Sequence, residues 1–142
     1  MRGRIYISKL KIPPEKHELE TARFFAERGH DIEFIPPNYS PEVHTPDIIM
    51  DGVAWEIKCP KGKSKRTIEN NFRKAAKQSR NIIIDLRRIN LKENICITQI
   101  RRELQGRPYI KRLLIIKRNE ELIDVTRKDD WLIREEIMLY VS

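Results

Sequence analysis

The clearest hydrophobic pattern in the chain is a pair of short apolar runs separated by two turn-forming residues. The runs 48–50 and 53–57 flank Asp51-Gly52. This dipeptide strongly favours the tight turn of a β-hairpin. We therefore predict two antiparallel strands here and take this hairpin as the centre of the fold.

Two acidic residues and a lysine lie at one end of this hairpin. Asp47 starts the first strand, while Glu56 and Lys58 lie near the end of the second. Because side chains two apart on a strand share a face, Glu56 and Lys58 should project together beside Asp47, with Ile57 in the opposite layer. An ordinary hairpin with solvated charges is the alternative.

This constellation suits the chemistry of a metal-dependent phosphodiesterase. Hard divalent cations take oxygen ligands and are commonly held by one or two carboxylates, so Asp47 and Glu56 are the predicted metal ligands. Lys58 would orient the attacking water or neutralise the developing charge. Mg²⁺ is the expected ion, with Mn²⁺ or Zn²⁺ as alternatives.

The rest of the pattern predicts helices and strands in alternation. Apolar residues recur at helical spacing in the segments 15–28, 67–79 and 95–104. Short apolar runs predict strands at 31–35, 81–86, 109–117 and 121–125, with a short strand or arm at 5–12. This order predicts an α/β sandwich with a central mixed β-sheet of four or more strands, flanked by helices.

Length and composition favour one domain with a polyanionic partner. The 142 residues predict a single domain with its core at about 15–126, and the tail 127–142 is left unplaced. A net charge of +8 and a pI near 9.7 favour nucleic acid as the partner. No apolar run approaches the roughly 18 residues of a membrane span. Residues 1–12 also lack the apolar segment of a signal peptide.

The two cysteines do not point to a metal centre. Cys59 and Cys96 have no close cysteine or histidine spacing, so a zinc site is not expected. None of the three histidines is placed to form a catalytic pair with Cys59. A reduced pair of thiols is the simpler interpretation.

The hairpin residues also carry a family resemblance. Pro46-Asp47, followed by Glu56-Ile57-Lys58, resembles the PD-(D/E)xK nuclease signature. With its flanks, the chain resembles the tRNA-cleaving C-terminal toxin domains of contact-dependent growth inhibition systems over about residues 15–126. Those flanks are Glu18-Leu19-Glu20-Thr21-Ala22, Gly29-His30-Asp31-Ile32, Ala75-Ala76-Lys77-Gln78-Ser79 and Asn81-Ile82-Ile83-Ile84-Asp85.

The resemblance implies an activity, a fold and further site residues. It implies a PD-(D/E)xK-like sandwich and an endoribonuclease toxin that cleaves tRNA in the cytoplasm of a target cell and has a cognate immunity protein. It also implies that the first helix contributes an acid to the site, and we assign this role to Glu18, with Glu20 in reserve. It further implies a polar residue beside the catalytic lysine, and we assign this role to Gln78. A helix N-terminal acid and an exposed helix-end glutamine are the respective alternatives.

Basic residues near the hairpin are the predicted contacts to the nucleic-acid backbone. Most of them lie in the glycine-containing loop 61–66 and on the helix that follows it. The full set is His44, Lys61, Lys63, Lys65, Arg66, Arg73 and Lys77.

Two other functions remain open from the sequence. A DNA endonuclease of the same superfamily, of the restriction or junction-resolving type, would share Asp47, Glu56 and Lys58. A non-catalytic nucleic-acid-binding domain is the third hypothesis. The full set of two acids and a lysine argues against it, because pure binding does not need this set and acids near a phosphate repel it unless a cation intervenes.

Overall fold

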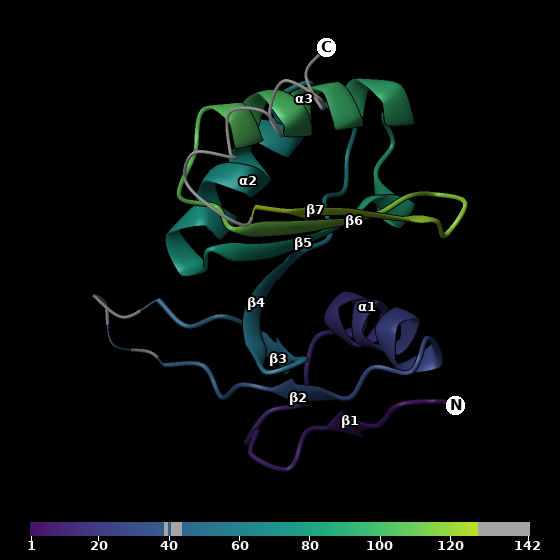
Figure 1. The fold of residues 1–142 in the computed structure, drawn as a ribbon, viewed down its shortest axis with the longest axis vertical. Helices are drawn as coiled ribbons and strands as arrows, with labels where there is room; N and C mark the ends of the chain where they lie inside the picture. Colours follow the sequence, from purple (N-terminus) through teal and green to yellow (C-terminus); the bar gives the residue numbers. More distant parts are fainter. Residues whose placement is uncertain (39, 41–43, 128–142) are drawn as a thin grey trace.

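A mixed β-sheet runs through the protein with its strands in sequence order (Figure 1). The structure is a computed structural model that describes residues 1–38, 40 and 44–127. Within these residues the sheet has seven strands, more than the four that the sequence requires. They are β1 (Ile5–Tyr6), β2 (Ile32–Phe34), β3 (Ile48–Met50), β4 (Val53–Lys58), β5 (Asn81–Asp85), β6 (Arg112–Ile116) and β7 (Leu122–Thr126).

Helices cover both faces of this sheet. Helix α1 (Lys16–Glu27) lies on one side, while α2 (Thr67–Gln78) and α3 (Glu93–Gln105) lie on the other (Figure 1). A short 3-10 helix, η1 (Leu86–Arg88), follows β5. The predicted α/β sandwich with a mixed sheet is therefore confirmed. The tail, which the sequence left unplaced, lies outside the described residues from residue 128 onward.

The alternation of side chains along β5 divides the core between the two faces. Ile82 and Ile84 pack in the same cluster as Phe72 of α2 and Ile100 of α3. Ile83 points to the other face and packs in the cluster that includes Phe25 of α1. Strands covered on both faces read as continuous apolar runs, which is why residues 82–84 carry no polar alternation.

The hairpin turn sets the register of the strands beside it. Asp51 has a φ of 55° and Gly52 a φ of 74°, as a two-residue type I′ turn requires. This turn pairs Met50 with Val53 and Ile48 with Trp55.

Strand β4 then changes its neighbours along its length. Its first half, residues 53–55, pairs antiparallel with β3. Its second half, residues 56–58, pairs parallel with β5, and Figure 1 shows the bend between the two halves. The region around Glu56 is therefore where the sheet divides.

A buried polar network joins α1 to the end of β5. Asp85, the last residue of β5, is fully buried. Its Oδ2 accepts a hydrogen bond from Thr21 Oγ1 at 2.7 Å and another from Arg87 Nη2 at 2.8 Å. Glu20, the reserve for Glu18, instead forms an ion pair with Arg88. These contacts hold α1 against the far half of the sheet.

We expect Thr21→Val to destabilise the fold by about 1–3 kcal/mol, because a buried carboxylate then loses one of its donors. Thr98→Val is the matched control, since the Thr98 hydroxyl is exposed and donates only to the Asn94 carbonyl of its own helix. Urea denaturation of both variants measures the difference. Equal losses of stability would show that the bond to Asp85 contributes nothing special.

Candidate active site

The hairpin register brings the two predicted metal ligands together. Ile48 pairs with Trp55, so Asp47 comes opposite Glu56 on the neighbouring strand. The Asp47 amide donates to the Trp55 carbonyl at 2.9 Å. In return, the Ile57 amide donates to Asp47 Oδ2 at 2.7 Å. The Asp47 carboxylate is thus held by the backbone of β4, with one oxygen committed to that bond.

Glu56 is a buried carboxylate with one oxygen in an ion pair and one without an N–H or hydroxyl donor. Its side chain is 5% exposed, and its Oε2 lies 3.3 Å from Lys58 Nζ. Among the described residues, no N–H or hydroxyl group donates to the buried Oε1 of Glu56, and the Asp47 carboxyl group lies within hydrogen-bonding reach of the Glu56 side chain. Because a buried acceptor without such a donor is unfavourable, this oxygen is suited to a ligand that the protein itself does not provide.

Glu18 joins this group from the first helix. It lies near the start of α1, and the negative charge of Asp47 contributes to its electrostatic environment. Burial, followed by the charges of Asp47 and Glu15, raises the pKa of Glu18 to about 7, against the opposing effect of Lys58. The structure therefore brings Glu18, Asp47 and Lys58 together, as predicted, although the catalytic roles remain predictions.

The carboxyl groups of the hairpin also hold their protons strongly. Burial, with the charge of Asp47 next in importance, raises the pKa of Glu56 to about 8. Burial likewise raises the pKa of Asp47. A cluster in which acids outnumber the single nearby ammonium group favours a positive ligand. The donor set of carboxylate oxygens, one of them without an N–H or hydroxyl donor, fits a hard divalent cation.

Gln78 lies at the end of α2, next to the contacts that attach this helix to β4. The adjacent Ser79 donates its hydroxyl to the Ala54 carbonyl at 3.2 Å, two residues before Glu56. Gln78 Oε1 is buried and, within the part of the chain that the structure describes, has no hydrogen-bond partner. The alternative of a fully exposed helix-end glutamine is therefore wrong, and its role beside Lys58 stays a prediction.

All seven predicted nucleic-acid contacts are exposed. Arg73 forms an ion pair with Glu69 at 2.8 Å on the surface of α2. Loop 61–66 is attached to the chain after η1, where the Asn90 amide donates to the Gly62 carbonyl at 2.7 Å. The seven exposed residues are His44, Lys61, Lys63, Lys65, Arg66, Arg73 and Lys77.

The sequence matches the family described as "Contact-dependent growth inhibition CdiA C-terminal domain" over residues 44–122, more than half of the chain. The chain belongs to this family. The match includes Asp47, Glu56 and Lys58, whereas Glu18 precedes it. No curated protein matches the sequence.

A solved structure has a similar fold to this CdiA C-terminal domain. It is the "CdiA-CT/CdiI toxin and immunity complex from Burkholderia pseudomallei". The similarity covers 88% of this chain and all of that chain, with a TM-score of 0.62 and 17% sequence identity. At this identity the comparison establishes a common fold.

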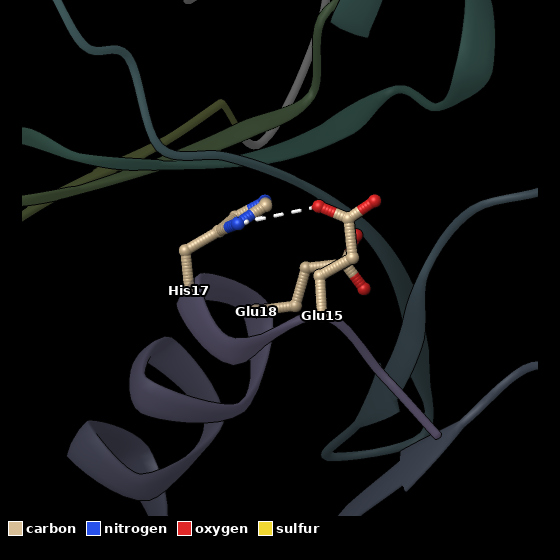
Figure 2. Close-up of side chains that lie close together, drawn as sticks. All are labelled: Glu15, His17 and Glu18. Atoms are coloured by element: carbon tan, nitrogen blue, oxygen red, sulfur yellow. Dashed lines mark ion pairs between the residues drawn. The ribbon is translucent and has the colours of Figure 1, made fainter. Parts of the chain in front are cut away.

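Glu15, the N-cap of α1, and His17 lie next to Glu18. They extend the acidic cluster formed by Glu18, Asp47 and Glu56 in this CdiA C-terminal domain. Glu15, His17 and Glu18 have potential ligand atoms within 4.8 Å of one another (Figure 2). His17 Nδ1 lies 3.3 Å from Glu15 Oε2, and the charge of His17 also acts on Asp47. The sequence predicts no role for His17, because this histidine is considered there only as a catalytic partner for Cys59. The available signal was its position one residue before Glu18.

None of the described helices is long and apolar enough to span a membrane.

The raised pKa values predict how stability depends on pH. Between the ordinary pKa of Glu56, 4.5, and its folded value of about 8, the folded state keeps a proton that the unfolded state releases. The contribution of Glu56 to the free energy of unfolding should therefore fall as pH rises through this range. Thermal unfolding of the metal-free protein at pH 5 and pH 8 measures it.

Glu56→Gln isolates this contribution, because glutamine cannot ionise. The variant should show a smaller fall in Tm between the two pH values than the wild type, and Mg²⁺ or Mn²⁺ should raise its Tm less at pH 8. Glu69→Gln, at an exposed ion pair on α2, is the matched control and should behave like the wild type. Identical pH profiles for Glu56→Gln and the wild type would contradict the assignment.

Proposed function

We propose that this domain is a metal-dependent endoribonuclease toxin that cleaves tRNA. The observation that supports this proposal most directly is the cluster of Asp47, Glu56 and Lys58, in which Glu56 is buried and its Oε1 receives no N–H or hydroxyl donor from the described residues. Membership of the CdiA C-terminal family and the net charge of +8 agree with it. A purely binding surface for phosphates has no need of buried carboxylates.

Asp47 and Glu56 are the residues that would hold the cation, and Glu18 lies close enough to add a third carboxylate. When bound, the divalent cation would polarise the phosphodiester and lower the pKa of water. The backbone bond from Ile57 fixes the orientation of Asp47. Lys58, held at 3.3 Å from Glu56, would place its ammonium group beside the reacting phosphate and offset its negative charge.

A DNA endonuclease with the same residues is the alternative activity, because both substrates contain the same phosphodiester.

The toxin proposal also requires a protein that protects the producing cell, since the activity would be lethal there. We propose a cognate immunity protein with an acidic contact face, complementary to the charge of +8. The similar solved structure is a toxin and immunity complex, which supports this partner. The expected place of action is the cytoplasm of a target cell.

Incubation with total tRNA and with duplex DNA, each with Mg²⁺ or EDTA, tests the activity on a gel. We expect tRNA fragments with Mg²⁺ and intact tRNA with EDTA. Duplex DNA should remain uncut. Fragments from DNA alone would select the alternative nuclease, and the absence of any cleavage would contradict both.

Expression of the domain alone should arrest bacterial growth, and normal growth with soluble, folded protein would contradict the toxin proposal.

Substitutions at the cluster should separate catalysis from folding. Asp47→Ala and Glu56→Ala should abolish cleavage while the protein stays folded, because they remove metal ligands. Lys58→Ala should lower the cleavage rate far more than the tRNA affinity, since it removes one charge among 29 lysines and arginines. Lys74→Ala, an exposed cation of α2, is the control and should retain the wild-type rate. Cleavage at the wild-type rate by either acid variant would overturn the site.

The loop 61–66 should contribute affinity without sequence information. Neutralising Lys61, Lys63, Lys65 and Arg66 together should weaken tRNA binding and reduce the slope of log affinity against log salt. The reduction should be roughly 0.7 to 0.9 for each phosphate that the loop no longer binds. Cleavage at saturating tRNA should survive, because the metal ligands are unchanged.

A set of four other exposed cations provides the control for this loop. Neutralising Lys11, Arg23, Lys92 and Lys111 removes the same charge from other segments. This control should change the salt slope less than the loop variant does. An unchanged slope for the loop variant would place the phosphate contacts elsewhere, most simply on α3 at Arg101 and Arg102.

A further inference from the structure

A cavity of about 310 Å³ opens beside the candidate active site. It lies between the N-terminal arm, the start of α1, the end of β2 and the segment before β3. Two residues of the acidic cluster, Glu18 and Asp47, form part of its wall. The apolar part of the wall includes Leu10, Ile12, Ile35 and Pro46.

The chemistry of this wall differs from that of the basic loop 61–66. Among the described residues that line the cavity there is no lysine or arginine, so this part of the wall offers no cation to a phosphate. It combines aliphatic and proline surfaces with the carboxyl groups of Glu15, Glu18 and Asp47. Aliphatic and proline surfaces pack against the face of a neutral ring, and carboxylates accept hydrogen bonds from amino groups at its edge.

The position of the cavity restricts what can enter it. Because Glu18 and Asp47 belong to both the cavity wall and the acidic cluster, its occupant must adjoin the phosphodiester that is cut. In RNA, the neutral groups next to a phosphodiester are the ribose and the base. Single-stranded RNA is commonly recognised through unstacked bases that enter pockets. The volume is at the lower end of the range for small-molecule sites, which suits one base.

We propose that this cavity binds one unpaired nucleobase of the RNA next to the scissile phosphate, and that it favours bases with an exocyclic amino group over uracil. The identity of the substrate rests on the proposed function. The cations of loop 61–66 then hold phosphates, while the cavity selects the nucleotide whose bond reaches the acidic cluster. This arrangement adds a local preference for bases with an amino group to a basic surface that binds phosphates without regard to sequence.

Titration of the intact domain with nucleosides tests the cavity without any cleavage. Methyl resonances of Leu10, Ile12 and Ile35 report on its wall. Those of Ile97 and Ile123, which pack against the core cluster on the opposite face of the sheet, are the reference. Adenosine and cytidine, added without divalent cations, should shift the wall resonances. Uridine should bind at least about threefold more weakly, the effect of one missing hydrogen bond.

Ribose 5-phosphate, which has no base, should leave the wall resonances unchanged. Equal shifts with ribose 5-phosphate would make the cavity a sugar-phosphate site and overturn the proposal. Wall resonances that no nucleoside moves, or that move only as much as the reference, would also overturn it. Equal affinity for uridine would overturn the preference for an amino group.

A matched pair of variants on the N-terminal arm provides the control. Ile12 is 71% exposed and lines the cavity, whereas Ile7 is 45% exposed and does not. Neither belongs to the core, so both alanine variants should fold. Ile12→Ala should weaken adenosine binding about fivefold, because it removes apolar contact area. Ile7→Ala should have no effect, and equal weakening by both would contradict a contact at Ile12.

The outcome of this titration is independent of the activity assay. If tRNA stays intact but adenosine shifts the wall resonances, the proposed function fails and the base site stands. If tRNA is cleaved but no nucleoside shifts these resonances, the nuclease stands and the base site fails.

Discussion

The backbone hydrogen bonds of β4 to two different strands are the constraint on which the rest of the structure depends. The type I′ turn at Asp51-Gly52 aligns residues 53–55 with β3, and residues 56–58 then pair with β5. Because each strand residue has a fixed partner, a shift of one position would turn Glu56 and Lys58 to the opposite face. The same register brings Asp47 opposite Glu56. The turn, the division of the sheet and the acidic cluster are therefore consequences of a single alignment.

Burying these carboxyl groups is unfavourable, and the two hydrophobic cores compensate for it. Burial and mutual repulsion raise the pKa values of Glu18 and Glu56 to about 7 and about 8. The surrounding core keeps the groups in place, with Ile57 packed towards α1 and Ile82 packed towards α2 and α3. Perturbed titrating groups of this kind are concentrated at functional sites. Among the described residues, the buried Oε1 of Glu56 also receives no hydrogen bond from an N–H or hydroxyl donor, which adds a geometric observation.

Charges of the two signs occupy different parts of this CdiA C-terminal domain. Loop 61–66 is exposed and basic, whereas Asp47 and Glu56 are largely withdrawn from solvent. Long-range attraction therefore favours a polyanion, while the local field of the acids opposes close approach of a phosphate. A cation held by the acids reverses that local repulsion. The proposed nuclease activity and the proposed base site both follow from this separation between a basic surface and an acidic interior.

The sequence by itself determined the features that depend on neighbours along the chain. The hairpin, the three helices and the convergence of Asp47, Glu56 and Lys58 follow from turn chemistry and periodicity over a few residues, and each was predictable. Only the tertiary structure decided which distant groups meet. The bond from Thr21 to Asp85 and the cavity beside Glu18 join segments up to 64 residues apart. The burial of Asp85 and the raised pKa values belong to the same group. Periodicity shows which face of an element is apolar, but the partner of that face, and hence the desolvation of each charge, is set by packing across the sheet.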